Sequence, residues 1–163
     1  MSYLKISLCI FITLAFSRFV PHPPNFTSLI ALSFYIPAIF GSRYISALVL
    51  SFIATDLFIG FHSVTFFTWG SVIFIGLGSK FFINNVFSRI CGSLFGGFLF
   101  YLITNFGVWT TGAYEFNING LINCYIAAIP FFVNTLISTI FLSFLIEVFM
   151  HIRNINILKK ANK

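Results

Sequence analysis

Charged side chains are scarce in this 163-residue chain: they make up 7% of it, and only three are Asp or Glu. Soluble domains carry about 25% charged residues, because a compact protein in water needs a polar surface. The shortage therefore excludes a soluble enzyme, a disordered protein and a nucleic-acid-binding module. With 59% hydrophobic residues and 25 phenylalanines, the composition predicts one all-α integral membrane domain over residues 1–163, with the lipid bilayer as its partner.

Catalytic sequence motifs are also lacking. The chain has no HExxH, no GxSxG and no GxxxxGK[ST] pattern. Its three cysteines, Cys9, Cys91 and Cys124, stand in apolar runs without CxxC spacing, which favours small buried side chains over disulfides or metal ligands. We therefore expect no enzymatic activity, no catalytic residue, no cofactor and no resident metal.

Six apolar segments are candidates to span a membrane, although a spanning helix needs about 20 residues and several of them are shorter. Prolines at positions 21, 23 and 24 and glycines at 41 and 60 separate the first segments, because these residues interrupt helices. A cleaved signal peptide is the alternative for the first segment, but no A-x-A-like site follows it. The six segments are Leu4–Val20, Phe26–Phe40, Tyr44–Ile59, Val64–Ser79, Ile90–Phe106 and Phe131–Ile152.

The last apolar stretch, Leu121–Ile152, is too long for one simple span. At about 1.5 Å per residue it would measure about 48 Å, against a hydrocarbon core of about 30 Å. Pro130 divides it. We therefore expect a short re-entrant or interfacial helix over Leu121–Ile129, followed by the sixth span. Two full spans would instead make seven helices.

The distribution of basic residues favours six spans over seven. With six spans, one side holds all the basic residues except Arg18, which satisfies the positive-inside rule. That side comprises Lys5, Arg43, Lys80, Arg89, Arg153, Lys159, Lys160 and Lys163. We expect a multi-pass protein of the bacterial inner membrane with both termini cytoplasmic, ending in a polar tail over residues 153–163.

The less common polar residues gather on the other, outer side. Ionisable groups at membrane depth are costly and usually face a cavity or a partner group. Asp56 and Arg18 lie at matching depths of the third and first spans, so that a pair would neutralise both. Such a pair can hold two helices together or can bind a ligand, and simple snorkelling to the interface is the third possibility.

Several short runs are distinctive. They are residues 18–27 (RFVPHPPNFT), 56–62 (DLFIGFH), 104–109 (TNFGVW), Cys124-Tyr125 and 130–135 (PFFVNT). Together they resemble an uncharacterised bacterial membrane-protein family, a domain of unknown function. That family is similar to the substrate-binding S components of energy-coupling factor (ECF) transporters, and the resemblance covers nearly the whole chain.

The resemblance implies a six-helix membrane subunit that captures a vitamin or related micronutrient from the outer side. It would dock on an ECF transmembrane coupling subunit driven by two ATPase subunits. Asp56 and Arg18 would bind polar groups of the substrate, while Trp109 and Tyr125 would pack on its apolar body. The full set of expected substrate-binding residues is Arg18, His22, Asn25, Asp56, His62, Asn105, Trp109, Tyr125 and Asn134.

Two other functions stay open. Small six-span proteins such as the MreD-like group serve the cell-shape machinery, and the outer polar residues would then hold helices or a partner protein. Metal uptake is the third hypothesis, because His22, Asp56 and His62 are suitable ligands for nickel or cobalt. Nickel and cobalt S components typically present a histidine directly after Met1, whereas this chain has Ser2.

Overall fold

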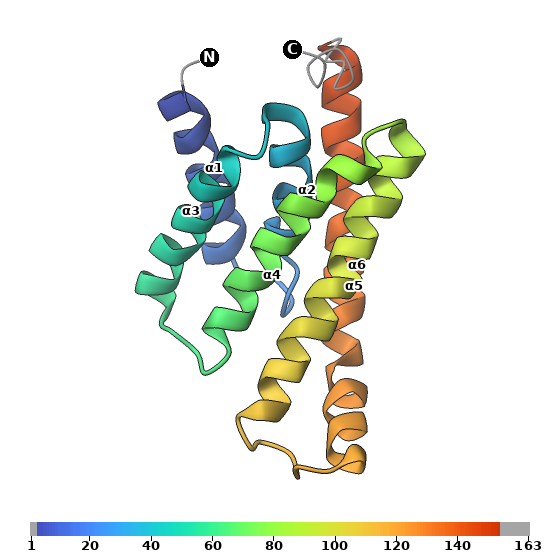
Figure 1. Ribbon diagram of the computed structural model, residues 1–163. Coiled ribbons are helices and arrows are strands. Elements are labelled where there is room, and N and C mark those ends of the chain that lie inside the picture. The colour runs from blue at the N-terminus through green and yellow to red at the C-terminus, as the bar shows by residue number, and fades with distance from the viewer. Residues whose placement is uncertain (1–2, 154–163) are drawn as a thin grey trace.

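The computed structural model describes residues 3–153, and the expected all-helical fold is confirmed over that range, with no strand (Figure 1). Lys159, Lys160, Lys163 and most of the expected polar tail lie outside the described residues. The elements are α1 (Tyr3–Phe19), α2 (Leu29–Phe40), α3 (Tyr44–Ile59), α4 (Thr65–Gly78), the 3-10 helix η1 (Ser79–Phe82), α5 (Val86–Thr110) and α6 (Ile118–Ile152).

Local signals set the helix boundaries. Helices α2 and α3 end at Gly41 and Gly60, whose φ angles of 96° and 109° lie in a region that favours glycine. Helices α5 and α6 begin after Asn85 and Asn117, whose side chains accept hydrogen bonds from the backbone N–H groups of Ser88 and Gly120. Asparagine is a favoured N-cap residue, and these two caps start both helices earlier than the apolar pattern predicts.

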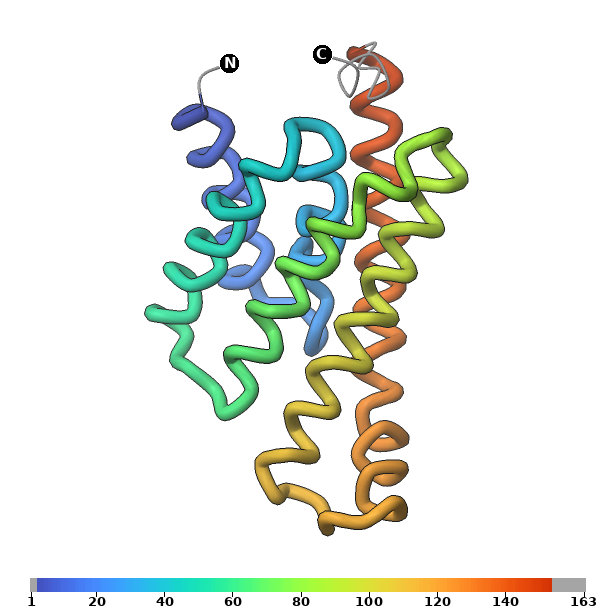
Figure 2. The backbone as a smooth tube through the Cα atoms, viewed as in Figure 1, coloured from blue at the N-terminus to red at the C-terminus, as the bar shows by residue number. Residues whose placement is uncertain are grey.

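The expected break in the last apolar stretch is wrong. Helix α6 runs without interruption over 35 residues, so Leu121–Ile129 is not a separate re-entrant or interfacial helix. Pro130 removes one backbone donor, but the apolar runs on both sides continue the helix around it. At about 1.5 Å per residue α6 is about 52 Å long. Figures 1 and 2 show the α5–α6 hairpin reaching beyond the neighbouring loops.

Successive helices alternate in direction, so that α1 begins and α6 ends at the same end of the bundle (Figure 2). We call this the basic end, because Lys5, Arg43, Lys80, Arg89 and Arg153 belong to the segments that lie there. Arg18 and Asp56 lie in the last turns of α1 and α3, at the opposite end.

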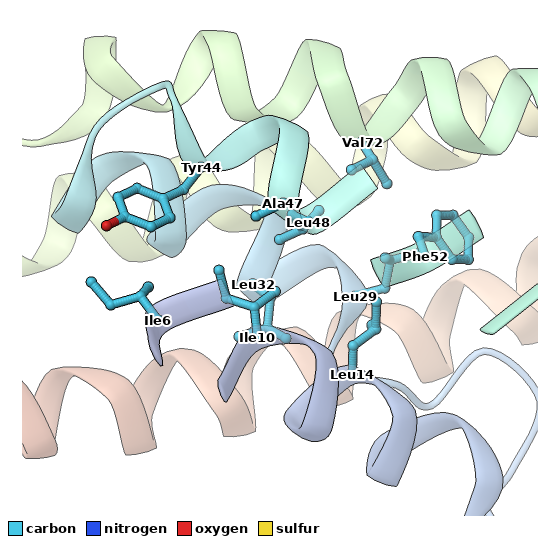
Figure 3. Close-up of a cluster of buried hydrophobic side chains, with 10 residues drawn as sticks. All are labelled: Ile6, Ile10, Leu14, Leu29, Leu32, Tyr44, Ala47, Leu48, Phe52 and Val72. Carbon is cyan, nitrogen blue, oxygen red and sulfur yellow. The ribbon is translucent and has the colours of Figure 1, made fainter. Parts of the chain in front are cut away.

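Helix α2 is the centre of the packing. It contacts each of the other five α-helices, and nine of its twelve residues are buried. One cluster of buried apolar side chains joins α2 to α1, α3 and α4, with Leu32, Ile10, Leu48 and Val72 among its members (Figure 3). A second cluster joins α2 to α4 and α6 through Phe34, Tyr35, Ile75 and Met150 and their neighbours.

The surface is more apolar than that of a soluble protein. Phe66 is 79% exposed, and many other large apolar side chains also lie on the outside. Small hydroxyl residues such as Ser33, Ser93 and Ser143 are buried instead. This distribution fits a lipid environment, where large apolar groups face the lipid and small residues allow close helix packing.

Three helical segments are long and apolar enough to cross a membrane: Thr65–Phe82, Val86–Thr110 and Ile118–Ile152. Helices α2 and α3 are apolar but shorter, with 12 and 16 residues. The expectation that all three cysteines are buried is wrong. Cys124 is buried, whereas Cys9 and Cys91 are exposed on the surface.

Gly92 lies where α5 packs tightly against the side chains of its neighbours. A Cβ atom there would lie 2.5 Å from the Cβ of Phe82 and 2.7 Å from Cε2 of Phe34. We expect Gly92→Ala to lower the free energy of unfolding by about 2 kcal/mol, because a packed interior resists added volume. Thermal unfolding in detergent measures the change. Gly70→Ala on α4 is the matched control, since nothing lies within 4 Å of its Cβ position; equal stability of the two variants would contradict the packing argument.

Candidate functional site

The structure brings Arg18 and Asp56 together. Nη2 of Arg18 lies 2.7 Å from Oδ1 of Asp56, which joins the last turn of α1 to the last turn of α3. The Asp56 side chain is 1% exposed and that of Arg18 13%. A buried carboxylate requires a partner of opposite charge, and Arg18 supplies it.

Further protein groups complete the environment of this pair. The indole Nε1 of Trp69 donates a 2.8 Å hydrogen bond to Oδ2 of Asp56. Nη1 of Arg18 donates to the Thr55 hydroxyl, and its guanidinium lies 4.5 Å from the centre of the Phe52 ring. Both carboxylate oxygens of Asp56 therefore contact protein groups, and Asp56 is closed off from any ligand in this conformation.

Sequence reasoning missed Trp69, although a signal for it existed. An indole N–H in an apolar helix needs an acceptor, and Asp56 is the only carboxylate in the segments that lead into α4. The interaction joins α3 to α4 across the Gly60–Val64 connection. The Arg18–Asp56–Trp69 cluster thus connects three helices at one end of the bundle.

Two adjoining cavities of about 200 and 130 Å³ lie beside this cluster. Arg18 lines the smaller cavity and Asn105 lines the larger one. Five residues line both, which shows that the two cavities are neighbours: Asn25, His62, Thr68, Phe100 and Thr135. We call the pair of cavities the opposite-end pocket. Four of the nine expected site residues, Arg18, Asn25, His62 and Asn105, line it.

The walls of the opposite-end pocket come from distant parts of the chain. Asn25 belongs to the α1–α2 connection and has a positive φ of 63°, which asparagine tolerates better than most residues. His62 follows α3 and is exposed, and its Nδ1 lies 3.1 Å from the Thr65 hydroxyl. Phe100 from α5 and Thr135 from α6 form the remaining sides. The pocket therefore combines hydrogen-bonding groups with apolar surface.

The other expected site residues do not line this pocket. Asp56 is enclosed in the cluster described above, and the side chains of the remaining four bind backbone carbonyl groups. His22 pairs with the carbonyl of Pro23, Trp109 donates to Glu115, Tyr125 donates to Leu102, and Asn134 donates to Pro24. Each of these hydrogen bonds lies within a loop or joins two segments of the chain.

Asn134 has an indirect connection with the pocket. Its Nδ2 donates a 3.0 Å hydrogen bond to the carbonyl of Pro24, which lies 110 residues away along the chain. The bond attaches the α1–α2 connection to α6, directly beside Asn25. Asn134 therefore positions the loop that carries one wall of the opposite-end pocket.

The described residues, 3–153, form no assembled set of metal ligands, as the metal-uptake hypothesis would require. Over residues 3–153, no three His, Cys, Asp or Glu side chains lie close enough together to hold a metal ion. His62 contacts Thr65, and the carboxylate of Asp56 contacts Arg18 and Trp69.

A second ion pair lies toward the basic end, and sequence reasoning did not predict it. Nε and Nη2 of Arg89 on α5 donate to the two carboxylate oxygens of Glu147 on α6, at 2.7 and 2.6 Å. The hydroxyl of Tyr35 on α2 donates to the same carboxylate at 2.9 Å. Arg89 and Glu147 are 58 residues apart in sequence, and no short-range pattern relates them.

Comparison with known proteins places the chain in a family. Residues 2–157 match DUF6580, described as a family of unknown function. The chain belongs to this family. Searches of curated proteins and of solved structures found no match. The expected likeness to a family of unknown function is thus confirmed for DUF6580, while nothing in the match links DUF6580 to ECF S components.

Proposed function

We propose that this DUF6580 protein is the membrane-embedded substrate-binding subunit of an ECF-type transporter. It binds a small vitamin-like molecule in the opposite-end pocket. The observation that carries the proposal is the pocket itself, which Arg18, Asn25, His62 and Asn105 line together with Phe100. Ligand sites commonly combine apolar walls with a few polar groups that fix orientation. The cavities of about 200 and 130 Å³ favour a ligand smaller than a typical drug.

The proposed topology has six membrane-crossing helices with the basic end in the cytoplasm. Five described basic residues, Lys5, Arg43, Lys80, Arg89 and Arg153, belong to the basic end, whereas Arg18 belongs to the other. The positive-inside rule then places the opposite-end pocket on the outer side. The shorter helices α1, α2 and α3 reach across by combining with the loops that flank them and by local thinning of the bilayer.

His62→Ala tests the proposal. We expect the amount of small molecule that co-purifies with this variant to fall at least about tenfold, because His62 is exposed and lines both cavities. Mass spectrometry of extracts from the purified protein measures the occupancy. His22→Ala is the matched control, since His22 lies in a loop at the same end but outside the pocket. Equal occupancy in the two variants, or no bound molecule in the wild type, would contradict the proposal.

Purification from native membranes tests the proposed partners. A coupling subunit and two ATPase subunits are expected to co-elute, since this chain has no nucleotide-binding motif of its own. Co-elution of cell-wall or cell-shape proteins in their place would favour the second function.

The second candidate function is a structural scaffold of the MreD-like kind. One observation favours it: the carboxylate of Asp56 is paired with Arg18 and accepts a hydrogen bond from Trp69, so this cluster joins three helices through protein groups alone. A scaffold needs a rigid outer end and no exchangeable small molecule. The two functions therefore predict different results when the ion pair is replaced by apolar residues of similar size.

A further inference from the structure

A second, larger cavity lies at the basic end, away from the opposite-end pocket. It has a volume of about 1010 Å³ and lies between the ends of α2, α4 and α6 and the starts of α1 and α3. Its inner part is formed by buried residues such as Ile6, Ile39 and Gly76. We call it the basic-end cavity.

The rim of the basic-end cavity carries three cations that form no ion pair with an acidic side chain among residues 3–153. Arg43, Lys80 and Arg153 line it, and all three are exposed. Within residues 3–153 the ion pairs are Arg18–Asp56 and Arg89–Glu147, and the one remaining acid of the whole sequence, Glu115, follows α5 at the opposite end. No acidic side chain of this chain is therefore left to neutralise the rim.

The cavity also has apolar walls that continue onto the surface. Leu77 and Phe149 line it, and they are 51% and 54% exposed. Tyr44 and Phe149 additionally lie under the guanidinium groups of Arg43 and Arg153, at 5.1 and 5.8 Å. A molecule in this cavity would meet positive charge at the rim and apolar side chains toward the surrounding lipid.

We propose that the basic-end cavity is a binding site for an anionic phospholipid. Its phosphate group lies among Arg43, Lys80 and Arg153, and its acyl chains leave past Leu77 and Phe149. Basic pockets between membrane helices are suited to acidic lipid head groups, because the charges attract the phosphate while the helices exclude water. A free anion would use the rim charges but not the apolar walls. The inference requires a membrane location and does not depend on the ligand of the opposite-end pocket.

Native mass spectrometry tests the site with dioleoyl phosphatidylglycerol, which is anionic. Dioleoyl phosphatidylcholine, which is zwitterionic and has no net charge, serves as the comparison lipid. The wild-type protein is expected to retain more phosphatidylglycerol than phosphatidylcholine. Lys80→Gln should weaken its retention about fivefold, as expected for the loss of one interfacial charge. Lys5→Gln is the matched control, because Lys5 lies at the same end but does not line the cavity. An equal loss in both variants would overturn the site in favour of general surface attraction.

A second variant separates the cavity from its charge. Ala38 lines the cavity and is only partly buried, so Ala38→Phe fills space while it keeps all three cations. This variant is expected to lose phosphatidylglycerol and to remain monodisperse. Full retention of the lipid by a folded Ala38→Phe protein would overturn the proposal. Displacement of the lipid by excess inorganic phosphate would do the same, since it would identify a simple anion site.

Discussion

Glu147→Gln is expected to lower the free energy of unfolding by about 3–5 kcal/mol, the loss typical of a broken buried ion pair. Glu147 accepts two hydrogen bonds from Arg89 and one from Tyr35, and the pair is almost fully buried. Removing the negative charge leaves the Arg89 guanidinium in the protein interior without a counter-ion. Denaturant or thermal unfolding of the purified protein in detergent measures the change.

Glu115→Gln is the matched control for this substitution. Glu115 is exposed, and its side chain accepts one hydrogen bond, from Asn117. Its replacement should change stability by less than about 0.5 kcal/mol, as is usual for surface sites. If Glu147→Gln were as mild as Glu115→Gln, the ion pair would not contribute to the stability of the bundle.

The double variant Arg89→Met/Glu147→Leu identifies the cause of the loss. Replacing both members of a buried ion pair by apolar residues is often neutral or stabilising, because no charge then remains without a partner. We expect the double variant to regain the stability that the unpaired Arg89 charge costs, but not that of the hydrogen bond from the buried Tyr35 hydroxyl, which loses its acceptor. A double variant as unstable as the single one would show that the acceptor for Tyr35 matters as much as the counter-ion for Arg89.

Most of the helix positions follow from the sequence. The predicted segment Tyr44–Ile59 is helix α3 to the residue, and the segments that became α1, α2 and α4 differ by at most three residues at either end. Apolar runs separated by proline and glycine contain this information directly. The apolar pattern predicts that the fifth helix begins at Ile90, four residues after its observed start, because Arg89 interrupts the apolar run. Its charge is compatible with a buried helix only because Glu147 lies opposite.

The continuous helix α6 shows a second limit of sequence reasoning. A length of 35 residues and an internal proline both favoured two elements. Whether a proline ends a helix or only bends it depends on the packing around it, and α6 lies along α5 for much of its length (Figure 1). The cap at Asn117 was the available local signal, since it places the helix start before the long apolar run.

Part of the candidate site could be predicted from the sequence, because the helix positions fix the depth of each residue in the bundle. Alternating helix directions place Arg18 and Asp56 at one depth, which counting residues along α1 and α3 predicts. That the two side chains contact each other is shown only by the structure. The opposite-end pocket also depends on Thr68, Phe100 and Thr135, which are common residues in apolar segments and carry no sequence signal. Trp109 and Tyr125 donate hydrogen bonds to backbone carbonyls of Glu115 and Leu102, and no pattern in the sequence predicts these two partners.

Asp56→Asn is expected to lower the free energy of unfolding by about 3 kcal/mol, because Arg18 loses its counter-ion in the interior. Trp69 can still donate to the asparagine side-chain oxygen, so the indole keeps an acceptor. Unfolding in detergent measures the loss, again with Glu115→Gln as the control. Protein that stays folded should keep its co-purifying small molecule, since Asp56 does not line the opposite-end pocket. An Asp56→Asn protein of wild-type stability would remove the support for the scaffold function.

The double variant Arg18→Met/Asp56→Leu then separates the two candidate functions. Stability should return in part: no unpaired charge remains, but the Trp69 indole N–H loses its acceptor. Arg18 lines the smaller cavity, so a binding protein should still lose its small molecule at least about tenfold after the fold is restored. If the protein is a scaffold, the double variant should regain its co-elution with cell-shape proteins together with its stability. Restored stability with unchanged ligand occupancy would exclude Arg18 from the binding site.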